Sequence, residues 1–197
     1  MSGTYDPDRI RRRLKPFDLS KMYRVIPEHH RSTPLGTGIA PSRFGDPAGK
    51  FAVLYAADSV SCAFWESMVR DRFTRMKRRR LSKHEVQTRL VVTLRSTQSV
   101  SLVDLRNDGP IRIGAPTAVA HDKNHAAGRA LAAAVHGTLP DADGFLYPSR
   151  FTGHACVAIF DRAIRKLQAL DMTLLITHTS FLAALDDYEI ELVDPPK

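Results

Sequence analysis

The sequence predicts a single α+β domain, in which flanking helices cover a central and mostly antiparallel β core. Three observations lead to this prediction. The chain has 197 residues, which suits one domain with a substantial core. Its composition is that of an ordinary globular protein, 43% hydrophobic and 25% charged. Short apolar runs alternate with a few helix-period segments, and no internal repeat is present.

The first twenty residues are polar and basic, so we expect an N-terminal extension at 1–20 followed by the main domain at 21–197. Arg9 and Arg11–Arg13 predict a short basic helix before Pro16. The N-terminus lacks the apolar region of a signal peptide, and no apolar run approaches the ~18 residues of a membrane span. The sequence therefore predicts a cytoplasmic protein without membrane contact.

Two strands and a long loop are expected in the next part of the chain. Residues 21–27 (KMYRVIP) and 51–57 (FAVLYAA) read as strands, and the second is apolar enough to be buried. Between them, residues 28–49 are rich in Gly, Pro, Ser and Thr. A loop of this length in a compact domain is usually functional or disordered.

A helix is predicted after residue 57, because Asp58 or Ser59 can cap its N-terminus. At 100° per residue its apolar side chains share one stripe. The helix is expected to end in the basic run 75–80, where cations suit the helix dipole. The members of the apolar stripe are Cys62, Trp65, Val69, Phe73 and Met76.

The second half of the chain contains further strands and helices. Residues 88–95 and 99–106 predict a strand pair joined by a short polar turn, and 144–160 reads as strand, turn, strand. A helix is predicted over 121–137, with Asp122 as its N-cap and Gly137 just after its end. Further elements are a strand near 172–177, a helix around 180–185 and a strand at 188–194.

Charge is unevenly distributed along the chain, whose net charge is +8. Residues 1–100 hold 20 Lys/Arg against 9 Asp/Glu, a net +11. Residues 101–197 hold 9 against 12, a net −3. This asymmetry favours a polyanionic ligand or an acidic partner, although a basic surface alone identifies neither.

Metal and nucleophile sites find little support in the sequence. The two cysteines, Cys62 and Cys156, lie in apolar surroundings without metal-ligand spacing, so we expect reduced core thiols. His121 and His125 are four residues apart without the acidic residue of a zinc-binding HExxH motif, so no metal site is predicted. His29 and His30 in the long loop fit either an acid–base role or an ordinary polar one.

Arginines near strand ends are more informative. Arg24 follows a tyrosine on a predicted strand, Arg43 ends the long loop, and Arg150 lies in a turn between strands. A guanidinium stays charged and can hold phosphate oxygens through two parallel hydrogen bonds. Such residues suit a pyrophosphate ligand, and the alternative is that each pairs with a surface carboxylate.

Glu66 is an acid at the edge of an apolar helical stripe, beside Cys62 and Phe73. A carboxylate in such a place is costly unless it is paired or hydrogen-bonded. It can form an ion pair with Arg70, four residues later, and such a pair stabilises a helix by only a few tenths of a kcal/mol. Alternatively, the carboxylate faces a cleft whose floor is the preceding predicted strand, 51–57, which also contains Tyr55.

Four segments, in this order and spacing, resemble the RES-domain family: YRV (23–25), SRFGDP (42–47), VLYAADSVSCAFWES (53–67) and GFLYPSRF (144–151). The resemblance runs from about Tyr23 to Phe160, roughly 70% of the chain. Members of this family are the toxins of bacterial RES–Xre toxin–antitoxin pairs. Their fold resembles ADP-ribosyltransferases, and they destroy NAD by hydrolysis or phosphorolysis of its nicotinamide–ribose bond. The resemblance thus implies a RES-like catalytic domain at 21–197.

The resemblance also implies the roles of individual residues. Glu66 would stabilise the oxocarbenium-like ribose near its 2′-hydroxyl, and Tyr55 would offer an aromatic face or a hydroxyl. Ser149 would position the nicotinamide carboxamide or the ribose. The remaining implied residues are arginines that hold the diphosphate, namely Arg24 and Arg43 with help from Arg150.

NAD is then a substrate, and no cofactor or metal is expected. The implied protein partner is a cognate Xre-type antitoxin, and a homodimer within a larger toxin–antitoxin complex is consistent with the resemblance. Nucleic acid would be contacted only through the antitoxin. Two other classes stay open from the residues: a basic RNA-targeting toxin that uses 75–80 with His29 and His30, and a non-catalytic protein that docks an acidic partner.

Overall fold

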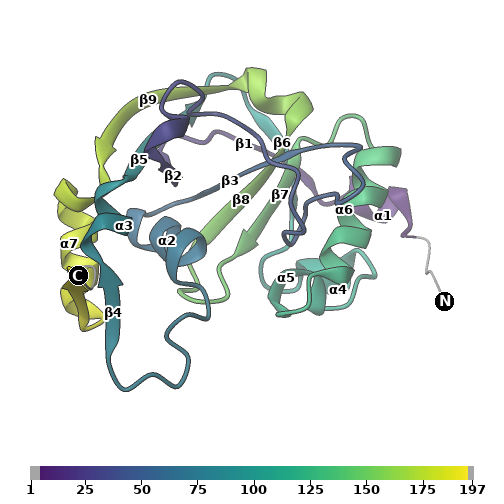
Figure 1. Ribbon diagram of the computed structural model, residues 1–197. Coiled ribbons are helices and arrows are strands. Elements are labelled where there is room, and N and C mark those ends of the chain that lie inside the picture. Colours follow the sequence, from purple (N-terminus) through teal and green to yellow (C-terminus); the bar gives the residue numbers. More distant parts are fainter. Residues whose placement is uncertain (1–4, 195–197) are drawn as a thin grey trace.

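The computed structural model describes residues 5–194 as a mixed α+β domain around one curled sheet (Figure 1). The eight strands of this sheet follow the order β1-β6-β7-β8-β3-β2-β5-β9, and every pairing except β6–β7 is antiparallel. The predicted fold class is confirmed. The strands are β1 (Leu14–Phe17), β2 (Met22–Pro27), β3 (Val53–Ala57), β5 (Arg89–Ser96), β6 (Val100–Asp104), β7 (Gly144–Pro148), β8 (Ala155–Phe160) and β9 (Leu167–Leu174).

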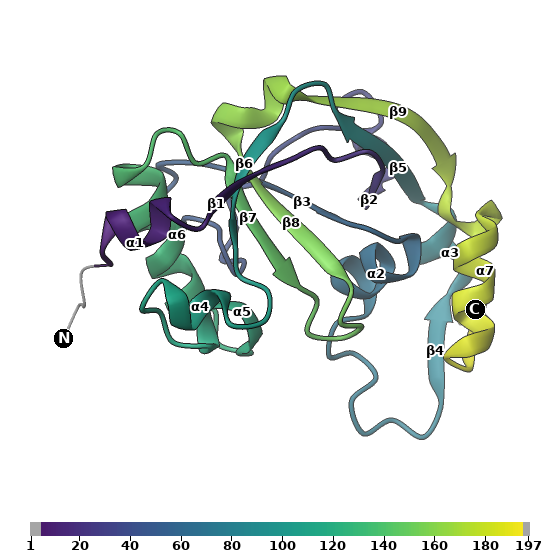
Figure 2. The same ribbon diagram turned by 180° about the vertical axis from the view of Figure 1, so that it is seen from behind.

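Helices gather at the two ends of the sheet, as the view from behind also shows (Figure 2). One group holds α1 (Pro7–Arg11), α4 (Gly109–Arg112), α5 (Ala118–His121) and α6 (Ala126–Thr138). The other group holds α2 (Val60–Phe64), α3 (Lys83–Gln87) and α7 (Thr179–Asp187), beside a small parallel sheet of β4 (Arg79–Ser82) and β10 (Ile190–Val193). The 3₁₀ turns are η1 (Glu28–His30), η3 (Asp161–Lys166) and η4 (Leu175–Thr177).

The central strands are apolar on both faces because both faces are covered. Successive residues of a strand point to opposite faces. On β3, Val53 packs into the cluster under α6, whereas Leu54 packs into a second cluster inside the curl. On β8, Phe160 and Ile159 divide in the same way. This explains why 51–57 reads as a continuous apolar run rather than an alternating one.

Part of the N-terminal segment belongs to the main sheet. The predicted short basic helix is confirmed by α1, which Asp6 caps by accepting hydrogen bonds from the amides of Asp8 and Arg9. Ile10 is fully buried, and β1 pairs antiparallel with β6. The domain boundary after residue 20 stays a prediction, and residues 7–17 contribute a helix and an edge strand to the same fold.

The prediction that 88–95 and 99–106 pair with each other is wrong. They form β5 and β6, but β5 lies between β2 and β9, and β6 lies between β1 and β7. The chain leaves β5 at Ser96, whose amide bonds the carbonyl of Leu19, and Thr97 bonds the carbonyl of Lys166. After these contacts the chain continues into β6, which lies near the opposite edge of the sheet from β5.

The helix predicted from 58 to the basic run 75–80 ends much earlier. Of the two candidate caps, Asp58 and Ser59, it is Ser59 that caps α2, by accepting a hydrogen bond from Cys62 N. The helix then widens into the π-turn η2 (Trp65–Val69) and stops at Arg70, with φ 47° and ψ −123°. Residues 79–80 form part of β4 instead, because pairing with β10 satisfies their backbone groups.

The helix predicted over 121–137 is divided into α5 and α6. Asp122 is not the predicted N-cap, because it ends α5 and its carboxylate accepts a hydrogen bond from Asn124 N in the turn between the helices. Asn124 in turn accepts from Ala126 N at the start of α6. Gly137 lies inside α6 rather than after it.

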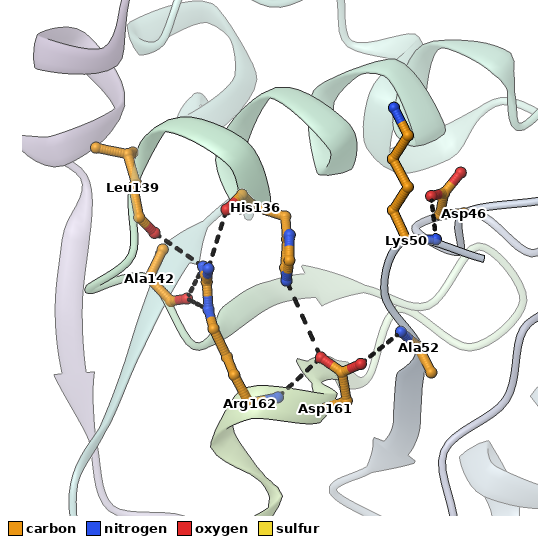
Figure 3. Close-up of polar contacts among 8 residues, drawn as sticks. All are labelled: Asp46, Lys50, Ala52, His136, Leu139, Ala142, Asp161 and Arg162. Atoms are coloured by element: carbon orange, nitrogen blue, oxygen red, sulfur yellow. Dashed lines mark hydrogen bonds and ion pairs between the residues drawn. The ribbon is translucent and has the colours of Figure 1, made fainter. Parts of the chain in front are cut away.

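The C-terminal end of α6 is held by one arginine, Arg162 of η3 (Figure 3). Its guanidinium donates hydrogen bonds to the carbonyl oxygens of His136, Leu139 and Ala142. The last carbonyls of a helix have no partner within the helix. Arg162 therefore caps α6 and ties it to the chain that follows β8.

His136 adds a pH-dependent element to the same network. Its ring stacks on Phe51 with 4.4 Å between centroids, and its Nε2 lies 4.0 Å from Asp161 Oδ1. Burial and the charge of Arg162 lower the pKa of His136, and the carboxylates of Asp161 and Asp46 oppose this shift. The folded protein therefore binds a proton at this ring less readily than the unfolded chain.

We expect thermal stability to fall as the pH drops below about 6.5, the ordinary histidine value, because the unfolded state then takes up more protons. Above that pH, the stabilisation that results from the lowered pKa of His136 is fully present. His136→Gln should flatten the dependence of Tm on pH between about 7.5 and 5.5, and the lowered pKa of His125 should leave part of the slope. An unchanged slope in thermal melts would contradict the assignment.

Within residues 5–194, no helix combines the length and the apolar character needed to cross a bilayer.

Candidate active site

A cavity of about 440 Å³ lies where the long loop 28–49, β2, β3, the α2–η2 helix and the β7–β8 turn meet. Its volume is in the range of small-molecule sites. The lining is strongly cationic, since five Lys or Arg side chains stand against two acids. An anionic ligand is therefore favoured. The cations are Arg24, Arg43, Arg70, Lys123 and Arg150, and the acids are Glu66 and Asp71.

Glu66 lies in this cavity on η2, and Ser149 holds it in place. The hydroxyl of Ser149 donates a hydrogen bond of 2.7 Å to Glu66 Oε1. The same oxygen of Ser149 accepts from the amides of Phe151 and Thr152 at 3.2 and 3.3 Å. Ser149 is 3% exposed, so its hydroxyl is committed to Glu66 and to its own turn. The carboxylate is thereby oriented by a rigid partner.

The simple ion pair between Glu66 and Arg70 does not form. Arg70 Nε donates instead to the backbone carbonyl of Glu66 at 2.8 Å. This contact follows from the end of the π-turn, where Arg70 takes a positive φ that is rare outside glycine. The carboxylate of Glu66 is left to Ser149 and to the cavity.

Arg43 is a buried cation that lines the cavity. Its side chain is 9% exposed, and its Nη1 is buried without a hydrogen-bond partner among the described residues. Burial lowers the pKa of Arg43, while the nearby Tyr147 and Glu66 act to raise it. A buried guanidinium with an unsatisfied N–H donor costs folding free energy unless a ligand accepts a hydrogen bond from that donor.

Tyr55 positions the loop that carries Arg43. Its hydroxyl accepts a hydrogen bond from Phe44 N at 2.9 Å and lies 2.9 Å from Ser42 Oγ. Burial raises the pKa of Tyr55, so the phenol stays neutral. Its ring lines the cavity, but its hydroxyl is engaged with the loop. The geometry favours the aromatic face, of the two roles predicted for Tyr55, as the part that meets a ligand.

Arg24 reaches the cavity from β2, and its Nη1 donates to the carbonyl of Gly36 at 2.9 Å. Burial lowers its pKa to about 10, so the side chain is still protonated at neutral pH. The Gly36 contact links the long loop to the sheet. Arg24 therefore has one face on the loop and another on the cavity.

Sequence reasoning brought the right segments together but missed several lining residues. The six predicted residues all belong to one constellation, with Ser149 joined to it through Glu66. Tyr147 is buried in the cavity wall, and burial raises its pKa well above the usual value. Its place in a motif used for Ser149 and Arg150 was the available clue. Other lining residues that were missed include Tyr23, Ser42, Ser67, Arg70, Asp71, Lys123 and His125.

Other candidate residues lie differently. Cys62 and Cys156 are buried as free thiols, as predicted, and the fold brings their sulfur atoms to 3.6 Å from each other. His29 and His30 are exposed on η1, lie with their ring centroids 4.2 Å apart in a tilted arrangement and are absent from the cavity lining. His125 lines the cavity, whereas His121 is exposed at the end of α5. Among residues 5–194, no group of three or more metal-ligating side chains is present.

Taken together, the cavity combines one oriented carboxylate with a buried guanidinium that lacks a partner. A carboxylate held in this way stabilises positive charge that develops on a bound molecule. The guanidinium groups suit the oxygens of a phosphate or diphosphate. The arrangement therefore fits a ligand with an anionic part and a part that becomes cationic.

Comparison with known proteins agrees with this geometry. The RES domain model matches residues 21–181. Over 112 residues the chain is 35% identical to the probable toxin y4kH of Sinorhizobium fredii, and the match covers 55% of this chain and 87% of that protein. A chain in the crystal structure of the M. tuberculosis MbcT–MbcA toxin–antitoxin complex superposes with a TM-score of 0.66 at 16% identity, covering 91% of this chain and 94% of the other. At that identity the superposition concerns the fold alone.

The family match extends over most of the chain and includes every residue placed around the cavity. The protein belongs to the RES domain family.

Proposed function

We propose that the protein is the toxin of a toxin–antitoxin pair and that it degrades NAD by cleaving the nicotinamide–ribose bond. The observation that carries the proposal is the Glu66–Ser149 contact of 2.7 Å in a cavity lined by arginines. The related protein of Sinorhizobium fredii is named a probable toxin, and the superposed structure is a toxin–antitoxin complex.

For this reaction the protein needs mainly to position the substrate and to stabilise the charge that develops. Nicotinamide is already a cationic leaving group when it is attached to ribose, so a strong general acid is not needed. As the bond breaks, positive charge spreads over the ribose ring. Glu66, oriented by Ser149, stabilises that charge and accepts a hydrogen bond from the 2′-hydroxyl. Glu66 is thus the principal catalytic residue of the proposal.

The cationic groups bind the other part of the substrate. Arg43 uses its unpartnered Nη1 for a phosphate oxygen, and Arg24 and Arg150 complete the contacts to the diphosphate. Tyr55 keeps the Arg43 loop in register and offers its ring to the bound molecule. Binding energy from the phosphates then holds the ribose against Glu66.

The acceptor of the ADP-ribosyl group is water, phosphate or a protein side chain. Purified protein incubated with NAD distinguishes these outcomes by its products. We expect free nicotinamide, together with ADP-ribose in plain buffer or its 1″-phosphate in phosphate buffer. Survival of NAD in both buffers would refute NAD cleavage. Cleavage of RNA by the same preparation would favour the RNA-targeting alternative.

Arg24→Ala is expected to relieve the growth arrest caused by expression of the protein, because it removes one cation of the proposed diphosphate site. The measurement is colony growth at matched expression, checked by immunoblot. Arg31→Ala is a suitable control, since Arg31 is exposed, lies outside the cavity lining and pairs with Glu28. Persistent toxicity of Arg24→Ala at normal protein level would contradict its assignment.

We also propose a cognate antitoxin of the Xre type as the protein partner, which covers the cavity or its entrance. Co-expression should yield a stable complex with no NAD cleavage, measured by size-exclusion chromatography and by nicotinamide release. A co-expressed antitoxin that neither binds the protein nor protects NAD would refute this part.

A further inference from the structure

Asp71 is the second acid that lines the cavity, and its side chain is 36% exposed. Its Oδ2 accepts from Arg150 Nη2 at 2.9 Å and lies 3.6 Å from Lys123 Nζ. One carboxylate oxygen therefore engages two cations from different parts of the chain. Arg150 comes from the β7–β8 turn, and Lys123 comes from the turn between α5 and α6.

The position of Asp71 is imposed by the chain around it. It follows Arg70, whose positive φ ends η2 and redirects the backbone. Arg150 is oriented from the other side, because its guanidinium lies 4.5 Å from the centre of the Phe151 ring. The hydrogen bond from Arg150 is the main cause that lowers the pKa of Asp71. Asp71 is therefore charged at neutral pH.

The cations that Asp71 engages are the outer members of the same group that contains Arg43. Arg43 has a buried Nη1 without a partner, and Arg150 has a buried Nε without one. The cavity thus holds more donors than its own carboxylates satisfy. The carboxylate of Asp71 pairs with two of the cations, whereas the Nη1 of the buried Arg43 has no partner among the described residues.

We propose that Asp71 is an internal counter-ion that occupies the outer part of an anion subsite formed by Arg43, Lys123 and Arg150, and that the diphosphate of the substrate displaces it. This inference deepens the proposed function and rests on it for the identity of the substrate. A diphosphate has more negative charge and more acceptor oxygens than one carboxylate, so the exchange is favourable for it. A singly charged anion gains much less from the same exchange. Asp71 therefore sets a threshold for binding, which a strongly held anion such as a diphosphate passes and a weakly held anion does not.

The test is equilibrium binding of ADP-ribose to the wild type and to Asp71→Asn by isothermal titration calorimetry. Removing the competing charge should tighten ADP-ribose binding by about tenfold at low salt, and the gain should shrink at high salt because exposed charges are screened. Adenosine, which has no phosphate, should bind the two proteins equally. Inorganic phosphate, used as a separate probe, should also bind more tightly to Asp71→Asn, and an unchanged phosphate affinity would contradict the competition between Asp71 and anions.

Glu85→Gln is the matched control. It removes the same charge from a nearby ion pair, in which Arg72 bonds Glu85 at 2.8 Å, and Glu85 does not line the cavity. It should leave ADP-ribose affinity unchanged. Lys123→Gln in the Asp71→Asn background should remove part of the gain, because one of the released cations is then missing.

Equal or weaker ADP-ribose binding by Asp71→Asn would overturn the inference, and so would an equal gain for adenosine or for Glu85→Gln. A lower Tm of Asp71→Asn with unchanged affinity would show that Asp71 only ties the loops together. Absence of ADP-ribose binding to both proteins up to millimolar concentration would also overturn it. The proposed function fails separately: if NAD is not cleaved but Asp71→Asn tightens ADP-ribose binding, the subsite stands without the reaction.

Discussion

Glu66→Gln is expected to slow NAD cleavage by about 10²–10³-fold, the typical loss when one preorganised polar group is removed from a transition state. Glutamine has nearly the same shape, and its amide can still contact Ser149. What it lacks is the negative charge that faces the developing ribose cation. The effect should therefore appear mainly in kcat, with a smaller change in KM.

Nicotinamide release under saturating NAD measures this effect. Glu85→Gln again provides an equal change of charge outside the cavity, and its rate should match that of the wild type. Thermal melts of both variants establish that they are folded. A Glu66→Gln rate within a few-fold of the wild-type rate would remove Glu66 from the reaction.

Arg162→Ala is expected to cause the largest loss of stability, about 3 kcal/mol. The carbonyl oxygens of His136 in the last turn of α6, Leu139 at its C-cap and Ala142 in the loop that follows lose a charged donor, and hydrogen bonds to charged groups contribute about 1.5–3 kcal/mol each before water replaces some of them. For a domain of this size, the loss corresponds to a Tm about 6–12 °C lower. The buried contacts between α6 and the sheet, including Leu131 and Val135, should weaken with it.

Arg165→Ala is the control for this prediction, since Arg165 lies on the same 3₁₀ turn and is exposed. Its removal should change Tm by no more than about 1–2 °C, as is usual for surface sites. Arg162→Lys should recover only part of the lost stability, because one ammonium group cannot reach all three carbonyls in the geometry of a guanidinium. Equal melting curves for Arg162→Ala and the wild type would refute the capping role.

Local patterns predicted most of the elements correctly. The apolar run at 51–57, the hairpin at 144–160 and the Ser59 cap depend on neighbouring residues, and all three are confirmed. The predictions were wrong where a segment pairs with a part of the chain that is distant in sequence. Residues 79–80 left the helical pattern to pair with β10, more than a hundred residues away. The strands β5 and β6 are adjacent in sequence but belong to different parts of the curled sheet.

The same distinction between local and distant relations applies to the site. The resemblance to the RES-domain family implied that Glu66, the arginines and Ser149 belong to one site. Sequence did not reveal that Ser149 binds Glu66, that the hydroxyl of Tyr55 serves the loop, or that Asp71 and Lys123 join the rim. Each of these relations joins residues that are far apart along the chain.

The sequence by itself determined the α+β class, the principal strands, the family and the residues around which the cavity forms, because these follow from periodicity and from motifs within short segments. Only the tertiary structure decided the order of the strands, the early end of the helix at Arg70, and the counter-ion role proposed for Asp71. The physical reason is that hydrogen bonds and ion pairs act over a few ångströms in space, whatever the separation of their partners in the chain.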